Sequence, residues 1–188
     1  MYITTYSGIH FTPLEPKPEE ILVRDIAHAQ SLMTRANGHF PEFYSVAQHS
    51  IACGREAIAR GYSARLVLAC LLHDGSEAYL SDITRPVKSV LPGYKEVEKV
   101  VQDVIYKKFL GEVPGEEEQE KIKSVDNTCL YYEFYHFMGE RLEMEPPKCY
   151  SNMEFVVRPF KEAEEELARM IREYGGIVCE KGIAGDKG

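Results

Sequence analysis

The stretch ARLVLACLLHD, residues 64–74, is the most apolar in the chain and the most informative about its fold. Residues 64–72 are almost wholly apolar, which predicts a helix that is buried on most of its sides. They run directly into His73 and Asp74, so two polar side chains follow a core element without a break. The stretch therefore predicts a central helix that carries a histidine and a carboxylate at its end.

Helical spacing of apolar residues predicts further elements on both sides of this stretch. We expect helices at about residues 25–37, 41–60, 97–105, 116–138 and 160–174. The first two dozen residues contain three prolines and alternate weakly, which favours extended or strand-like structure. Residues 81–93 contain two prolines and a glycine and are predicted to form a loop. The expected fold is an all-α helical bundle with a short extended, β-like N-terminal segment.

The length of 188 residues suits one sizeable core and is too short for two. We expect a single domain over residues 1–174 and a flexible, glycine-containing tail over residues 175–188. No run approaches the roughly 18 apolar residues that a membrane helix needs. The N-terminus lacks the basic head and apolar stretch of a signal peptide, so we expect a cytoplasmic protein.

The net charge of −8 argues against a nucleic-acid polymer as partner, because such proteins usually carry a basic surplus. A small anionic substrate stays compatible, since an acidic protein can contain a local basic pocket. The five cysteines are scattered and form no CxxC pair, so the sequence suggests neither a zinc ribbon nor a disulfide framework. They are interpreted as small buried hydrophobic residues or surface thiols.

Four side chains that can bind metal lie on or beside the apolar faces of successive predicted helices. They are His49, His73, Asp74 and Asp126, and Asp126 has apolar residues one turn away on either side. Buried ionised groups are costly unless they are paired or bound to a metal. Two imidazoles and two carboxylates suit one divalent ion, such as Mn²⁺, Co²⁺, Fe²⁺, Zn²⁺ or Mg²⁺. Each residue alone is more often a core histidine, a cap or an ion-pair partner, and only their combination favours a metal site.

Two further carboxylates are candidates for catalysis. Glu77 lies four residues after His73, and on a continuous helix it could orient or deprotonate a metal-bound water. The alternative is a surface glutamate paired with a nearby base. Asp82 could support Glu77 or bind a substrate hydroxyl, and the alternative is a turn residue.

Three basic side chains flank the candidate metal ligands in the sequence. Arg35, Arg85 and Lys88 could bind phosphate oxygens, or they could be solvated surface charges. His39 follows Arg35 in a loop and could contact substrate or be functionally neutral.

These residues lie in motifs that resemble a known family. YSVAQHS (44–50), LLHDGSEAYLSDITRPVK (71–88) and SVDN (124–127) resemble the HD-domain superfamily of metal-dependent phosphohydrolases. Within it the chain looks most like the 5′-deoxynucleotidases and related small bacterial and phage deoxynucleotide hydrolases. SGIHFTPL, DIAHAQSL and RANGH, in the N-terminal part, resemble the same group, and the similarity runs over most of residues 7–135.

The resemblance implies a helical bundle that binds one divalent metal through His49, His73, Asp74 and Asp126. It also implies catalytic roles for Glu77 and Asp82 and phosphate contact by Arg35. It leaves open a second metal brought by the substrate, and it suggests a homodimer or a higher homo-oligomer.

The implied activity is hydrolysis of a deoxynucleoside monophosphate to the deoxynucleoside and phosphate. The nearest alternative is a triphosphohydrolase that releases tripolyphosphate from a deoxynucleoside triphosphate. Another substrate of the superfamily, such as an alarmone or a cyclic nucleotide, is a further alternative. The non-enzymatic alternatives are a nucleotide-binding regulatory HD domain and a purely structural helical protein.

Overall fold

The structure is a computed structural model that describes residues 1–185, with side chains described up to Cys179. The helices are α1 Val23–Leu32, α2 Val46–Ala59, α3 Ala64–Leu71, α4 Glu77–Leu80, α5 Arg85–Val90, α6 Tyr94–Leu110, α7 Glu116–Met138 and α8 Phe160–Gly185. Two short antiparallel strands, β1 Ile3–Thr4 and β2 His10–Phe11, form the only sheet within these residues. The turns η1 Pro18–Glu20 and η2 Arg35–Gly38 are 3-10 helices. The predicted all-α fold with a short β-like N-terminal segment is confirmed.

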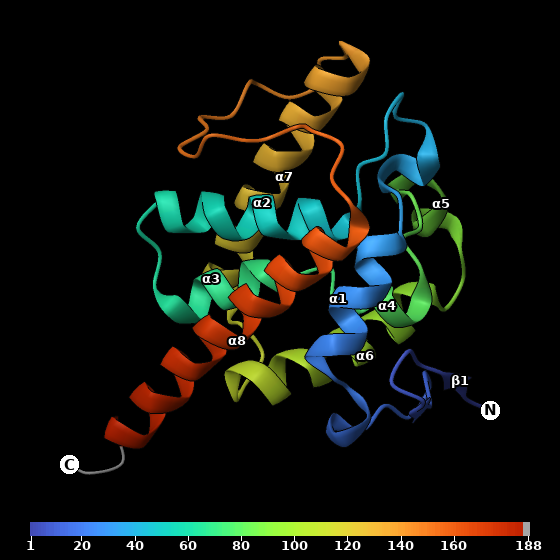
Figure 1. Cartoon of the computed structure of the whole chain (residues 1–188), viewed down its shortest axis with the longest axis vertical. Helices are drawn as coiled ribbons and strands as arrows, with labels where there is room; N and C mark the ends of the chain where they lie inside the picture. Colours follow the sequence, from blue (N-terminus) through green and yellow to red (C-terminus); the bar gives the residue numbers. More distant parts are fainter. Residues whose placement is uncertain (186–188) are drawn as a thin grey trace.

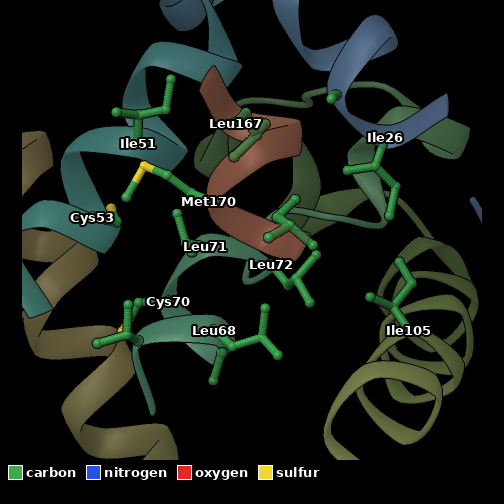
Figure 2. Packing of buried hydrophobic residues seen from close by; sticks show 14 of the residues in the cluster. Ile26, Ile51, Cys53, Leu68, Cys70, Leu71, Leu72, Ile105, Leu167 and Met170 are labelled. Atoms are coloured by element: carbon green, nitrogen blue, oxygen red, sulfur yellow. The ribbon is translucent and has the colours of Figure 1, made fainter. Parts of the chain in front are cut away.

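Helix α3 lies in the middle of the bundle, as its apolar sequence predicts. It packs against α2, α6, α7 and α8, and α8 runs across α1, α2 and α3 (Figure 1). Leu68, Leu71 and Leu72 are fully buried, and Figure 2 shows Leu71 between α2 and α8, beside Met170. Burying each such side chain stabilises the fold by about 1.5–3 kcal/mol. The close packing around α3 fixes where its C-terminal end lies.

Helix α2 begins at Val46, five residues later than the proline-based prediction. Ser45 is the N-cap, and it forms a capping box in which its hydroxyl accepts a hydrogen bond from the Gln48 amide. The Gln48 side chain in turn accepts one from the Ser45 amide, so two amide donors at the start of the helix are satisfied. The capping box therefore determines the start of α2, and Pro41 lies outside the helix.

Helix α1 also ends earlier than predicted, at Leu32. The backbone then turns at Ala36 and Asn37, both with φ of 51°, a conformation that few non-glycine residues adopt. Arg35 therefore lies in η2, a separate short turn, where its amide donates to the Tyr44 carbonyl.

The segment 81–93 contains a short helix, α5, where a loop was predicted. Pro86 occupies its first turn, where a missing N–H costs nothing because that donor has no partner inside the helix. The turn between α3 and α4, residues 72–76, is also not part of one continuous helix. His73 and Glu77 thus lie on different elements, and the prediction that they share one helix is wrong.

The predicted flexible tail from residue 175 is helical as far as Gly185. Glycine in a helix costs roughly 1 kcal/mol, and burial of Leu167 and Ile171 in the preceding turns offsets that cost. Tyr174 and Val178 also pack against the core. Residues 186–188 of the predicted tail lie outside the described residues. Among the described residues, no helix has both the length and the apolar character needed to cross a membrane.

Candidate metal centre

The structure brings together the four predicted metal ligands from three separate elements. His49 lies on α2, His73 and Asp74 in the turn after α3, and Asp126 on α7. His49 Nε2 lies 3.2 Å from His73 Nε2 and 3.3 Å from Asp126 Oδ1. Asp74 Oδ2 lies 3.3 Å from His73 Nε2 and 3.7 Å from His49 Nε2. Atoms that bind one divalent ion at roughly 2.0–2.2 Å lie about 3–3.5 Å apart, so the spacing fits a single ion.

The second nitrogen of each imidazole contacts a group that can only accept a hydrogen bond. His49 Nδ1 lies 2.5 Å from Glu133 Oε1, and His73 Nδ1 lies 2.8 Å from the Cys70 carbonyl oxygen. Each Nδ1 therefore carries a hydrogen, which leaves Nε2 of each imidazole as the atom that can bind a metal ion. Such an arrangement is typical of metal-binding histidines, because a cation between the two nitrogens removes their repulsion.

The charges around the two imidazoles favour a positive charge at this point. Burial and Arg35 lower the pKa of His49, but Glu133 and Asp126 outweigh both and raise it well above 6.5. Burial raises the pKa of Asp126, whereas His49 and His73 lower it well below 3.8. The carboxylates therefore stabilise a cation, and the residues present fit a divalent metal ion.

Cys53 is a further donor beside this group. Its Sγ lies 3.5 Å from His49 Nε2, and the donor atoms of Cys53, His49 and His73 all lie within 4.8 Å of one another. Burial, followed by the neighbouring Cys129, raises the pKa of the Cys53 thiol well above its ordinary value. We prefer the His–Asp set because its two carboxylates offset the charge of a divalent ion and lie 3.3–3.7 Å from the imidazole Nε2 atoms.

Arg35 lies next to the candidate ligands and is buried, with its Nε 3.4 Å from Glu133 Oε2. Its Nη1 lies 3.6 Å from both Asp74 Oδ2 and Asp82 Oδ2. A guanidinium in this position can offset negative charge on a bound phosphate. His39, predicted as a substrate contact, is exposed at the end of η2 and is not among the described residues that line the adjacent cavity.

Glu77 is the most unusual carboxyl group of the site. It is buried, and its Oε2 has no hydrogen-bond partner among the described residues. Burial, together with the charges of Asp74 and Asp82, raises the pKa of Glu77 well above 4.5. Lys88 Nζ lies 3.7 Å from Glu77 Oε1 and 2.5 Å from Glu98. A carboxyl group with a raised pKa keeps its proton to a higher pH than an ordinary glutamate, as a general acid requires.

A cavity of about 890 Å³ opens beside these residues, between η2 and helices α4 to α7. Its wall includes His73, Asp74, Asp126 and the predicted residues Arg35, Glu77, Asp82, Arg85 and Lys88. Arg85 is largely exposed, and its Nη2 donates to Asp126 Oδ2 over 2.7 Å. Apolar side chains such as Phe40, Ile83 and Phe134 line other parts of the wall. The volume is that of sites for small organic ligands, about 300–1,000 Å³.

Glu133 is a site residue that the sequence analysis missed. It lies on α7 seven residues after Asp126, which is two helical turns, so both side chains share one face. It is also the one charged residue in the aromatic run LYYEFYHF, residues 130–137, apart from the titratable His136. A single carboxylate at helical spacing from a predicted ligand is the signal that could have identified it.

Comparisons with known proteins give similarity without an activity. No family model matches the sequence. The chain is 37% identical over 108 residues to Escherichia coli K12 YfdR, a protein described as uncharacterized, and the match covers 57% of this chain and 58% of YfdR. It is also 37% identical over 109 residues to the uncharacterized protein RCAP_rcc00048 of Rhodobacter capsulatus, covering 55% of each. The chain thus matches little more than half the length of these curated relatives.

Proposed function

We propose that this chain is a metal-dependent phosphohydrolase that removes the 5′-phosphate from deoxynucleoside monophosphates. The observation that carries the proposal is the convergence of four donor atoms at 3.2–3.7 Å, with both imidazole Nδ1 atoms hydrogen-bonded to acceptors. The motifs that resemble HD-domain phosphohydrolases contain the same four residues. His49, His73, Asp74 and Asp126 would hold the ion, which polarises the phosphoryl group and acidifies a bound water.

Arg35 is the principal phosphate-binding residue in this proposal. Its side chain lines the cavity beside Asp74 and is always charged. It stabilises the negative charge that the phosphate oxygens carry in the transition state. Lys88 adds a second positive charge in the same wall, and the apolar side chains of the cavity cover the deoxyribose or the base.

Glu77 is the general acid in this proposal. Its burial and raised pKa support a carboxyl group that donates a proton to the 5′ oxygen as the bond from phosphorus to that oxygen breaks, and that regains a proton from the water that attacks phosphorus. Asp82 contributes to that raised pKa, and its Oδ2 lies 3.6 Å from Arg35 Nη1. Without this proton the leaving group is an alkoxide, which is a poor leaving group.

A second activity is favoured by the size of the cavity and by further lysines in its wall. Lys95, Lys99 and Lys123 line the cavity in addition to Lys88, and they could offset the charge of a triphosphate. The alternative is therefore a triphosphohydrolase that releases tripolyphosphate from deoxynucleoside triphosphates. The homo-oligomer and the cytoplasmic location expected from the sequence stay predictions.

Phosphorus NMR of the products tests the proposal. Metal-free protein is incubated with dAMP or dATP after addition of Mn²⁺ or Co²⁺, with His73→Ala and Glu77→Ala as controls. We expect orthophosphate from dAMP and no change in dATP. Tripolyphosphate from dATP would favour the triphosphohydrolase, and no product with either nucleotide under any metal would remove both activities. An alarmone substrate or a binding role would then be the better explanation.

A further inference from the structure

We propose that Glu133 is a positioning residue that couples the metal-binding imidazole of His49 to the phosphate-binding guanidinium of Arg35. Its two carboxylate oxygens are divided between these partners. Oε1 lies 2.5 Å from His49 Nδ1, and Oε2 lies 3.4 Å from Arg35 Nε. The phosphate half of this proposal rests on the proposed function, whereas the metal half concerns binding alone.

Glu133 acts through its partners because it does not reach the cavity itself. It is fully buried and is not among the described residues that line the cavity. A buried carboxylate costs several kcal/mol unless its partners compensate, so a glutamate among aromatic residues is poorly explained by packing. Both of its partners, His49 and Arg35, belong to the candidate site, and they come from α2 and η2, which are separate in the sequence.

The contact with His49 fixes which imidazole nitrogen is free to bind metal. Because Glu133 Oε1 only accepts, His49 Nδ1 must donate, and the Nε2 lone pair faces His73 and Asp126. A carboxylate in this position also makes the imidazole more basic. Losing such a partner typically weakens metal binding by about 10–100-fold.

The contact with Arg35 fixes the orientation of the guanidinium fork. The hydrogen bond of this side chain to a described residue runs through Nε and not through either terminal nitrogen. Nη1 approaches Asp74 and Asp82 only at 3.6 Å, which is longer than a hydrogen bond. Glu133 therefore holds Arg35 through Nε and leaves the terminal nitrogens, Nη1 and Nη2, available to an anion in the cavity.

Glu133→Gln tests this coupling because it keeps the shape of the side chain and leaves one acceptor oxygen. The amide can accept from His49 or from Arg35, but not from both. We expect cobalt to bind about 10–100-fold more weakly, as measured by titration calorimetry. We also expect weaker binding of inorganic phosphate to the cobalt-loaded protein, measured from the width of its phosphorus resonance.

Glu56→Gln is the matched control. Glu56 is equally buried and satisfied by hydrogen bonds from Arg60, Tyr150 and Ser151, which are not part of the candidate site. This variant should lose stability but bind cobalt and phosphate within about twofold of the unmodified protein. If Glu133→Gln and Glu56→Gln lost equal affinity for cobalt and phosphate, Glu133 would have only a structural role and the proposal would be overturned.

Each remaining outcome also has a definite meaning. The proposal is overturned if Glu133→Gln binds cobalt within about threefold of the unmodified protein. It is also overturned if the variant loses cobalt affinity but binds phosphate as before.

If the variant does not fold, nitrogen-15 NMR of the unmodified protein, labelled at histidine and loaded with zinc, replaces the binding measurements. His49 is expected with the hydrogen on Nδ1, and a hydrogen on Nε2 would overturn the proposal. Since none of these measurements uses turnover, a protein that binds both ligands but hydrolyses no nucleotide would remove only the proposed function.

Discussion

The close approach of α2 and α3 at Gly54 sets the distance between two candidate metal ligands, and replacing Gly54 by alanine tests this dependence. A Cβ atom at this position would lie 2.4 Å from Leu71 Cδ2, 2.8 Å from Leu71 Cγ and 3.3 Å from Met170 Cε. Leu71 is fully buried and Met170 nearly so, and both lie in the packed region of Figure 2. Leu71 therefore has to change its rotamer, or α3 has to move away from α2.

The expected loss of stability follows from two opposing contributions. Alanine in a helix gains roughly 1 kcal/mol over glycine, whereas overpacking a core typically costs about 1–3 kcal/mol. The net loss for Gly54→Ala is therefore about 0–2 kcal/mol. Because α2 carries His49 and α3 leads into His73, the same movement lengthens the 3.2 Å distance between the Nε2 atoms. We therefore also expect weaker cobalt binding.

Urea unfolding measures this loss against a control in another helix. Gly176 lies in α8 with nothing within 4 Å of the position of an added Cβ, so Gly176→Ala should stabilise the protein by up to about 1 kcal/mol. In a Leu71→Ala background the two shortest contacts are gone and only the 3.3 Å contact with Met170 Cε is left, so Gly54→Ala should become neutral or stabilising. The reasoning would be refuted if Gly54→Ala raised the free energy of unfolding as much as Gly176→Ala does. It would also be refuted if Gly54→Ala changed that free energy equally with Leu71 and with Ala at position 71.

Three further predictions follow from the site and its surroundings. Cobalt at about 100 times its Kd should raise the free energy of unfolding by about 2.7 kcal/mol and the Tm by roughly 5–11 °C. Differential scanning fluorimetry measures the Tm, and His73→Ala should show no shift. The absence of a shift in the unmodified protein would contradict a metal site. Burial raises the pKa of Glu56, but hydrogen bonds from Ser151 and Arg60 outweigh it and hold the pKa below 4.5. Glu56→Gln should therefore cost about 2–4 kcal/mol above pH 5, and the difference from the unmodified protein should shrink as the pH falls through the lowered pKa of the folded state; a constant difference down to pH 3 in urea titrations would argue against it. Arg85→Ala should change stability by less than about 1 kcal/mol, since this ion pair is exposed, but should weaken phosphate binding to the metal-loaded protein; unchanged phosphate binding would place Arg85 outside the substrate site.

The helices that sequence reasoning predicted best are those whose boundaries depend on local signals. Helix α7 begins at Glu116 and ends at Met138 as expected, where Gly139 takes a φ of 65° that suits glycine. Pro41 misled the prediction for α2 because a proline tolerates several structures, whereas the capping box at Ser45 satisfies two amide donors. The glycines at 175 and 176 misled the prediction for α8, since long-range packing offset their helix cost.

The candidate ligands could be predicted because His49 and Asp126 lie beside the apolar faces of α2 and α7, and His73 and Asp74 directly follow the apolar helix α3. Their partners could not, because the contacts depend on the fold: Glu133 reaches His49 across 84 positions and Arg35 across 98. The same reason explains Arg35 itself, whose buried position among carboxylates no local pattern indicates. His39 illustrates the opposite case, since a polar residue near a motif can point away from the cavity.

The most direct test of a metal centre built from His49, His73, Asp74 and Asp126 is the anomalous scattering of crystals of the cobalt-loaded protein, recorded at the cobalt absorption edge. We predict one anomalous peak, from a cobalt ion that lies about 2.0–2.2 Å from the two Nε2 atoms and from one oxygen of each aspartate. The absence of a peak, or a cobalt ion bound by Cys53 and the histidines without the aspartates, would contradict the account.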